Sequence, residues 1–196
     1  MDGRLYQASV SKFQRVGSSV EYLARKFDRP KWILKDSQPY LQPNKIGAHS
    51  ITNCLRAVDD KLSFWTCSLT EADLGEVALA LATPMQKLEA IDIVLFHVDE
   101  FQTDSITLEA TAGNCPVDDL VSRHRDAIGL DLSKLSSIAR RVADKARDAT
   151  TPHCKRIAQS TLKGLVQRAV DRGRLNASLL QPSVLKQLGF SIENTT

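Results

Sequence analysis

A strand–helix–strand pattern between residues 62 and 98 constrains the fold of this chain more than any other feature. Leu62 to Ser68 is rich in aromatic and β-compatible residues, and Ile91 to Val98 is a nearly continuous β-branched and aromatic run, which predicts a strand covered on both faces. Leu74 to Ala82 is apolar at almost every position, so we expect a helix buried on most sides, with Thr70 as its N-cap. The pattern predicts a βαβ unit in an α/β core.

The segments around this core carry weaker patterns. Apolar residues recur at three- and four-residue steps from Val10 to Phe27, which predicts an amphipathic N-terminal helix. Lys31 to Lys35 is predicted to be extended, and Ser105 to Ala110 to be a further strand. Ile46 to Val58 fits a helix or a strand, of which the helix is favoured.

The C-terminal half is predicted to be helical. Its expected helices are Val117 to Ile128, Leu132 to Ala149, Pro152 to Arg172 and Pro182 to Leu188, the last ending at Gly189. The predicted fold class is therefore α/β or α+β, with a small central sheet. Residues 1–115 are expected to form the α/β core with the N-terminal helix. Residues 116–196 are expected to form a helical region of three to four helices, packed on that core or forming a subdomain.

Composition places the chain among ordinary globular proteins. It has 196 residues, of which 42% are hydrophobic, enough to bury a substantial core. Its four cysteines are far apart and form no Cys-x-x-Cys, and the first ten residues do not resemble a signal peptide, so we expect free thiols and a cytoplasmic location. The longest apolar stretch, 91–98, is far shorter than the roughly 20 residues of a membrane helix, so no membrane partner is expected.

Charge is sorted along the chain into three blocks. The net charge is +6 for residues 1–56, −11 for residues 57–122, +8 for residues 123–174 and 0 for the remainder. Such segregation predicts surfaces that meet oppositely charged neighbours, either within the fold or outside it.

The second basic block supplies the predicted binding residues. On projected helices its cations fall on arcs opposite the apolar stripes, which suits a polyanion, an acidic protein, the acidic block of this chain or a second copy. No aromatic residue occurs between 116 and 189, so nucleic-acid contact would be with backbone phosphates and not by base stacking. The candidates are Arg141, Lys145, Lys155, Arg156, Lys163 and Arg174.

Two catalytic alternatives arise in the central block. Asp99, Glu100 and Asp104 follow a predicted strand and would suit a hard cation such as magnesium, but the preceding turn has no glycine and no Lys or Arg lies between Lys61 and Lys87. Cys67 would be a nucleophile only if His97 or His124 approached it. No metal and no other cofactor is therefore predicted.

The predicted function is a non-enzymatic binding or adaptor module that acts through its separate acidic and basic surfaces. It would self-associate or bind a protein partner, in a multi-component assembly. Two alternatives remain open: a nucleic-acid-binding protein that uses the basic C-terminal helices, and a metal-dependent hydrolase or phosphoryl-transfer enzyme that uses the strand-end carboxylates.

Overall fold

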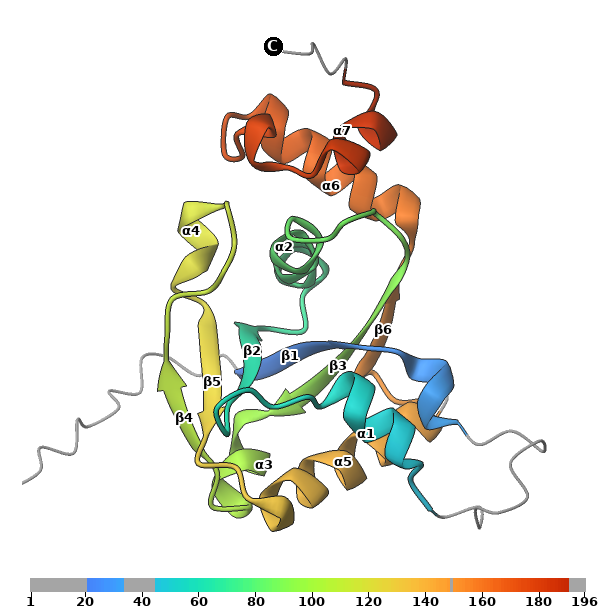
Figure 1. Cartoon of the computed structure of the whole chain (residues 1–196), viewed down its shortest axis with the longest axis vertical. Helices are drawn as coiled ribbons and strands as arrows, with labels where there is room; N and C mark the ends of the chain where they lie inside the picture. Colours follow the sequence, from blue (N-terminus) through green and yellow to red (C-terminus); the bar gives the residue numbers. More distant parts are fainter. Residues whose placement is uncertain (1–20, 34–44, 149, 191–196) are drawn as a thin grey trace, which may run out of the picture.

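Six antiparallel strands form one sheet at the centre of the protein (Figure 1). The computed structural model describes residues 21–33, 45–148 and 150–190. The strand order is β4-β5-β2-β1-β3-β6, and the α/β or α+β fold class is confirmed. The strands are β1 (Tyr22–Phe27), β2 (Leu62–Cys67), β3 (Ile91–His97), β4 (Thr107–Ala110), β5 (His124–Ile128) and β6 (Cys154–Ile157).

Helices cover both faces of this sheet. The α-helices are α1 (Ala48–Cys54), α2 (Glu71–Ala82), α3 (Val98–Thr103), α4 (Asp118–Val121), α5 (Leu132–Arg147), α6 (Gln159–Asp171) and α7 (Pro182–Leu188). Two 3₁₀ helices complete the described elements, η1 (Arg29–Trp32) and η2 (Ala177–Leu179).

The central strand–helix–strand unit is present, but another strand divides it. β1 pairs antiparallel with both β2 and β3, so β2 and β3 run in the same direction without contacting each other. The predicted strands at 62–68 and 91–98 are confirmed, and the Thr70 hydroxyl caps α2 by accepting a hydrogen bond from the Asp73 amide. The predicted βαβ unit is therefore confirmed, and β1, which was predicted as part of a helix, lies between its two parallel strands.

α2 is enclosed on two sides. The sheet curves around one side of it, and α6 and α7 lie on its outer side (Figure 1). Its buried residues are Leu74, Val77, Ala78, Leu79, Ala80 and Ala82, as expected for a helix that is apolar all round. We call the face of the sheet towards α2 the concave face. The opposite face carries α1, α3 and α5.

β3 joins the two cores on either side of the sheet. Successive side chains point to opposite faces of a strand. Ile93 and Leu95 accordingly pack in the core around α2, while Val94 and Phe96 pack in the core beneath α5. All four are fully buried, so the prediction that this strand is covered on both faces is confirmed.

The predicted N-terminal helix is wrong where the structure describes it. Residues 22–27 form β1, and residues 10–20 lie outside the described residues. Leu23 and Phe27 share one face, but a spacing of four residues places side chains on one face in a strand as well as in a helix. The predicted extended piece at 31–35 is also wrong in its described part, because Lys31 and Trp32 belong to η1.

Two predicted C-terminal helices contain strands. Residues 124–128 form β5 instead of the end of a helix, and residues 154–157 form β6 before α6 begins. β5 pairs with β2, and β6 pairs with β3. These pairings join segments far apart in sequence, so the local periodicity of the sequence does not reveal them. The other predictions are confirmed in α1, β4, α5 and α7, and α7 ends at Gly189 in the left-handed conformation, with φ 81°.

Among the described residues, no helix is both long enough and apolar enough to cross a membrane.

The aromatic contacts beneath the sheet should be central to stability. Phe64 is fully buried and meets Phe96 and Phe101 edge to face, with ring centroids 5.7 and 5.1 Å away. Phe64→Ala should lower the free energy of unfolding by about 3–5 kcal/mol, measured by urea denaturation. The control Leu132→Ala removes a side chain that is 81% exposed and should change it by less than about 0.5 kcal/mol. Equal losses in the two variants would contradict this account of the core.

Candidate functional site

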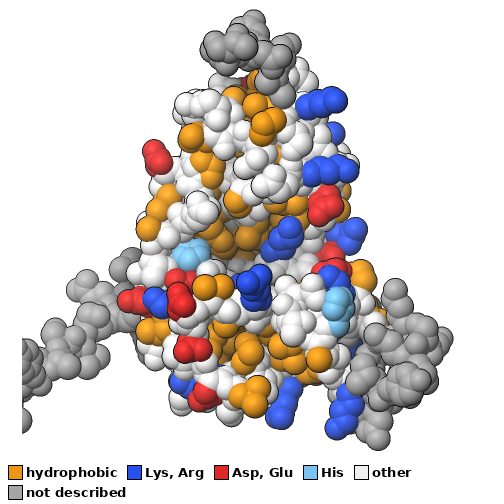
Figure 2. Space-filling view, in the orientation of Figure 1, with side chains coloured by type: hydrophobic (Ala, Val, Ile, Leu, Met, Phe, Trp, Pro, Cys, Tyr) orange, Lys and Arg blue, Asp and Glu red, His pale blue; other side chains and the backbone are white. Residues whose placement is uncertain are grey.

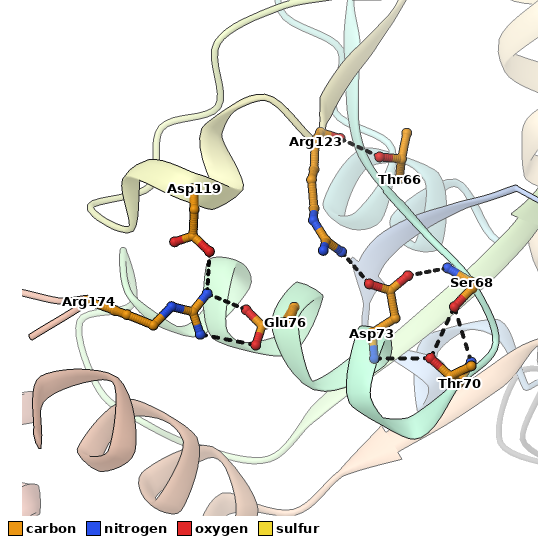
Figure 3. Close-up of polar contacts among 8 residues, drawn as sticks. All are labelled: Thr66, Ser68, Thr70, Asp73, Glu76, Asp119, Arg123 and Arg174. Atoms are coloured by element: carbon orange, nitrogen blue, oxygen red, sulfur yellow. Dashed lines mark hydrogen bonds and ion pairs between the residues drawn. The ribbon is translucent and has the colours of Figure 1, made fainter. Parts of the chain in front are cut away.

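Two acidic residues of α2, Asp73 and Glu76, bind cations from other elements (Figure 3). Asp73 pairs with Arg123, which follows α4, and also accepts a hydrogen bond from the Ser68 amide. Glu76 pairs with Arg174 at 2.7 Å, and Arg174 also contacts Asp119 of α4. These pairs tie α2 to α4 and to the segment after α6.

The charges of this cluster are stabilised by their partners. Burial favours the neutral form of Asp73, but the hydrogen bonds from Ser68 and Arg123 outweigh it and lower the pKa of the carboxyl group. Hydrogen bonds to Glu76 and Asp119 raise the pKa of Arg174 above its usual value. Both residues therefore remain charged and engaged at neutral pH.

A second network joins α3 to α5. Arg141 donates two hydrogen bonds to Asp104, at 2.7 and 2.9 Å, and contacts Glu100 at 3.4 Å. Lys145 pairs with Glu100 at 2.9 Å, and Ser137 donates a further hydrogen bond to Asp104. The hydrogen bond from Arg141 is the main cause that lowers the pKa of Asp104.

Four of the six predicted binding cations are thus engaged within the chain. Arg141, Lys145 and Arg174 belong to the networks above, and Arg156 contacts Asp92 through both carboxylate oxygens at 3.1 Å. Lys155 and Lys163 form no ion pair with any described residue, and each is half-buried. The structure does not bring the six together on one free surface, because most of them pair with carboxylates from other elements. A helical projection of the sequence cannot predict such tertiary pairs.

The three candidate metal ligands do not converge. The Asp99 side chain is 73% exposed and, among the described residues, pairs with the His97 ring alone, whereas Glu100 and Asp104 face the cations of α5. Across the described parts of the chain, no three His, Cys, Asp or Glu side chains are arranged to hold a metal ion.

Cys67 is not placed to act as a nucleophile. It is buried, and this burial raises the pKa of its thiol to about 12, so the thiol stays protonated at neutral pH. Neither candidate histidine approaches it within the described contacts: His97 accepts a hydrogen bond from the Asp99 amide, and His124 is bonded to Thr111.

A row of polar residues crosses the concave face beyond the part covered by α2. Directly opposed residues share one face of a sheet. The strand registers pair Glu109 with Asp126, Asp126 with Ser63, and Ile93 with both Lys26 and Lys155. Continuing the β1–β2 register by two residues places Lys26 opposite Ser63. We call Glu109, Asp126, Ser63, Lys26 and Lys155 the concave-face row.

This row is accessible and electrically polarised. Glu109, Ser63 and Lys26 are exposed, and Asp126 and Lys155 are half-buried. The carboxylates lie on β4 and β5, and the ammonium groups lie on β1 and β6. In Figure 2, several acidic side chains gather on the β4–β5 side of the molecule, and most basic side chains in view lie on the opposite side, interspersed with acidic ones.

Hydrogen bonds hold the acidic end in place. Ser63 and Thr111 donate their hydroxyl protons to the two oxygens of Asp126, at 2.9 and 3.0 Å. Because the single Thr111 proton is used there, the Thr111 oxygen must accept from Nδ1–H of His124, 2.7 Å away. His124 is 8% exposed, and burial lowers its pKa, so it is a neutral imidazole that carries its proton on Nδ1.

The order of these groups suits binding better than nucleophilic catalysis. A serine nucleophile needs a base within hydrogen-bond reach and a third group that orients the base. Here His124 bonds to Thr111 and not to Ser63, and Ser63 bonds directly to Asp126. The network therefore fixes the position and the charge of Asp126 on the concave face.

A pocket of about 440 Å³ lies beside the basic end, where β1 ends and β3 begins. Lys26 and Arg156 contribute to its lining, as does Arg25, which donates to the carbonyl oxygens of Cys54 and Ser63 at 2.9 and 2.6 Å. Burial lowers the pKa of Arg25 to about 10, which still leaves it charged at neutral pH. Asp28, Glu89 and Asp92 also line the pocket, so it carries charges of both signs.

Sequence reasoning missed Lys26, Ser63, Glu109 and Asp126. Each lies on a different strand, and Lys26 and Asp126 fell within segments predicted as helices. The polar Ser63 between the apolar Leu62 and Phe64 was the one available signal, since neighbouring residues of a strand point to opposite faces. Only the strand register brings the four together.

No protein-family model matches this chain, and the comparisons with curated proteins and with solved structures also find no match.

The α3–α5 network should respond to one substitution. Arg141→Met keeps the side-chain stem but leaves Asp104 and Glu100 without the guanidinium, so the free energy of unfolding should fall by about 1–3 kcal/mol in urea denaturation at neutral pH. Because the folded-state pKa of Asp104 is lowered, its stabilising effect is present above the ordinary carboxyl pKa of about 3.9 and is lost as the pH falls.

The difference between wild type and Arg141→Met should accordingly shrink at acid pH. Arg140→Met is the matched control, because Arg140 is the exposed neighbour on the same helix. If both variants lost equal stability, or if the difference grew as the pH fell, the assigned role of Arg141 would be wrong.

Proposed function

We propose that this protein is a non-enzymatic binding module that holds a protein partner along the concave-face row. The observation that carries the proposal is the polarised row itself, which has residues on five of the six strands, with carboxylates at one end and ammonium groups at the other; the β3 position between the two lysines is the buried Ile93. A surface with both signs in a fixed order selects a partner with the complementary order.

The charges of the row are available to a partner. Glu109 has one ion-pair contact with a described residue, Lys61, at 3.9 Å, and both side chains are about half exposed. Such exposed ion pairs contribute little to the free energy of folding, so a partner can replace them at little cost. Lys26 and Lys155 pair with no carboxylate in the described parts of the chain. Binding would therefore not require strong internal pairs to break.

The two signs favour a protein over a polyphosphate. A nucleic acid presents phosphates of one sign at regular spacing and is bound by rows of Lys and Arg. Along this row it would meet Asp126 and Glu109, which repel it. A protein surface can present basic groups to the acidic end and acidic groups to the basic end.

Charge reversal at the basic end tests the proposal. The double variant Lys26→Glu/Lys155→Glu makes the whole row acidic, and the control Lys87→Glu/Lys186→Glu makes the same charge change at two sites outside the row. Tagged chains should be used for affinity capture from cells that express the protein, with captured proteins quantified by mass spectrometry. A thermal melt of each variant establishes that it is folded.

Wild type and the control should both capture at least one protein. An untagged copy of this chain counts as such a protein. Its yield should fall about tenfold or more with the reversed row, because each attraction becomes a repulsion. An unchanged set of proteins in unchanged amounts, or no capture by wild type, would contradict the proposal.

A further inference from the structure

The two edges of the sheet present backbone groups to solvent. In an antiparallel ladder the residues alternate between those that hydrogen-bond to one neighbour and those that face away. Leu95 N–H donates to the His153 carbonyl at 2.8 Å, so Lys155, two residues on, also bonds towards β3. The backbone groups of Cys154 and Arg156 must then point away from the sheet.

The same alternation applies at β4. Thr111 N–H donates to the His124 carbonyl, so Glu109 bonds towards β5, while the backbone groups of Leu108 and Ala110 point outward. Within the described parts of the chain, no other backbone group pairs with these outward groups on either edge. Each edge therefore offers two residues with free N–H and C=O groups.

The two edges match in direction. β4 and β6 are the two edge strands of a sheet in which every pair of neighbours is antiparallel. The direction reverses at each of the steps between the six strands, which is an odd number of times, so β4 and β6 run in opposite directions. If a second copy in the same orientation is placed beside the first, its β6 therefore lies antiparallel to β4. The second copy can therefore extend the sheet with the same antiparallel pattern of backbone hydrogen bonds.

Register then decides which side chains meet. If the outward groups of Leu108 and Ala110 pair with those of Arg156 and Cys154 in the next copy, Glu109 lies directly opposite Lys155 on the concave face. In the corresponding two-fold arrangements, a β4 edge paired with another β4 edge puts Glu109 opposite Glu109. Two paired β6 edges put Lys155 opposite Lys155. Like charges directly opposite destabilise a pair of strands, whereas opposite charges stabilise it.

We propose that copies of this chain associate head to tail, β4 of one copy adding to β6 of the next, with Glu109 against Lys155. The proposal rests on the proposed function and specifies its partner as a second copy. Each junction joins the acidic end of one concave-face row to the basic end of the next. Such an interface is heterologous, so it builds rings or open chains and does not stop at a two-fold dimer.

Sedimentation velocity of the full chain across a concentration series tests this inference. The weight-average mass should rise with concentration past that of a dimer. Glu109→Lys and Lys155→Glu should each weaken association about tenfold, because an attractive pair becomes a repulsive one. Glu89→Lys, an exposed site with the same charge change outside the row, should associate like wild type.

Two combinations distinguish the pairing from a general charge effect. The variant with both reversals again has opposite charges at each junction and should recover association. An equimolar mixture of the two single variants should also associate, because each junction between unlike chains again sets an ammonium group against a carboxylate. A wild type that stays monomeric at every concentration, a mass that stops at a dimer, or no recovery in the double variant would overturn the inference.

Ala110→Pro separates this inference from the proposed function. Proline removes an N–H group that faces away from the sheet and is tolerated at edge strands, so the fold and the charges of the row remain. The variant should lose self-association. If wild type proves monomeric while a different protein is captured in a row-dependent way, the edge pairing fails and the binding function stands.

Discussion

Burial of α2 is the constraint on which the rest of this structure depends. The helix is apolar on nearly all sides, so it needs cover on all of them: the curved sheet on one side, and α6 with α7 on the other. Asp73 and Glu76 of this helix are engaged by Arg123 and Arg174, which fix α4 and the end of α6 around it.

The concave-face row is a consequence of this arrangement. α2 packs over Ala24, Trp65, Cys67 and Leu95, which line the covered part of the concave face. The next row of side chains lies beyond its reach and is polar. Ile93 is the exception in that row, and it is buried in the same core. Polar side chains in a fixed order of charge are therefore left on the concave face on both sides of Ile93.

The oppositely charged blocks of the sequence pair largely with each other within the fold. Cations of the second basic block pair with carboxylates of the acidic block through Arg141 and Asp104, Lys145 and Glu100, and Arg174 and Glu76. Half-buried pairs of this kind align elements that are far apart in sequence. What remains for a partner is the smaller set on the concave face.

The sequence alone was sufficient to predict those helices and strands that are marked by local residue patterns. Thr70 marks the start of α2, Gly189 marks the end of α7, and β3 is recognisable because it is apolar on both faces. β1 was missed because Leu23 and Phe27 lie four residues apart, a spacing that suits strand and helix alike. The candidate site was beyond sequence reasoning for a related reason. Lys155 and Arg156 were placed together on a helix, but in β6 they point to opposite faces, one into the row and the other to Asp92.

Disulfide trapping tests the central claim most directly, that the acidic end of one row meets the basic end of the next. Directly opposed residues that do not share backbone hydrogen bonds lie about 4.5 Å apart at Cα, within the range that a disulfide spans. Chains with Glu109→Cys and chains with Lys155→Cys, both carrying Cys154→Ser, should form a mixed disulfide dimer on mild oxidation when combined. Each chain alone should form few or no dimers. Cross-linking of either chain to itself as readily as to the other would contradict the account.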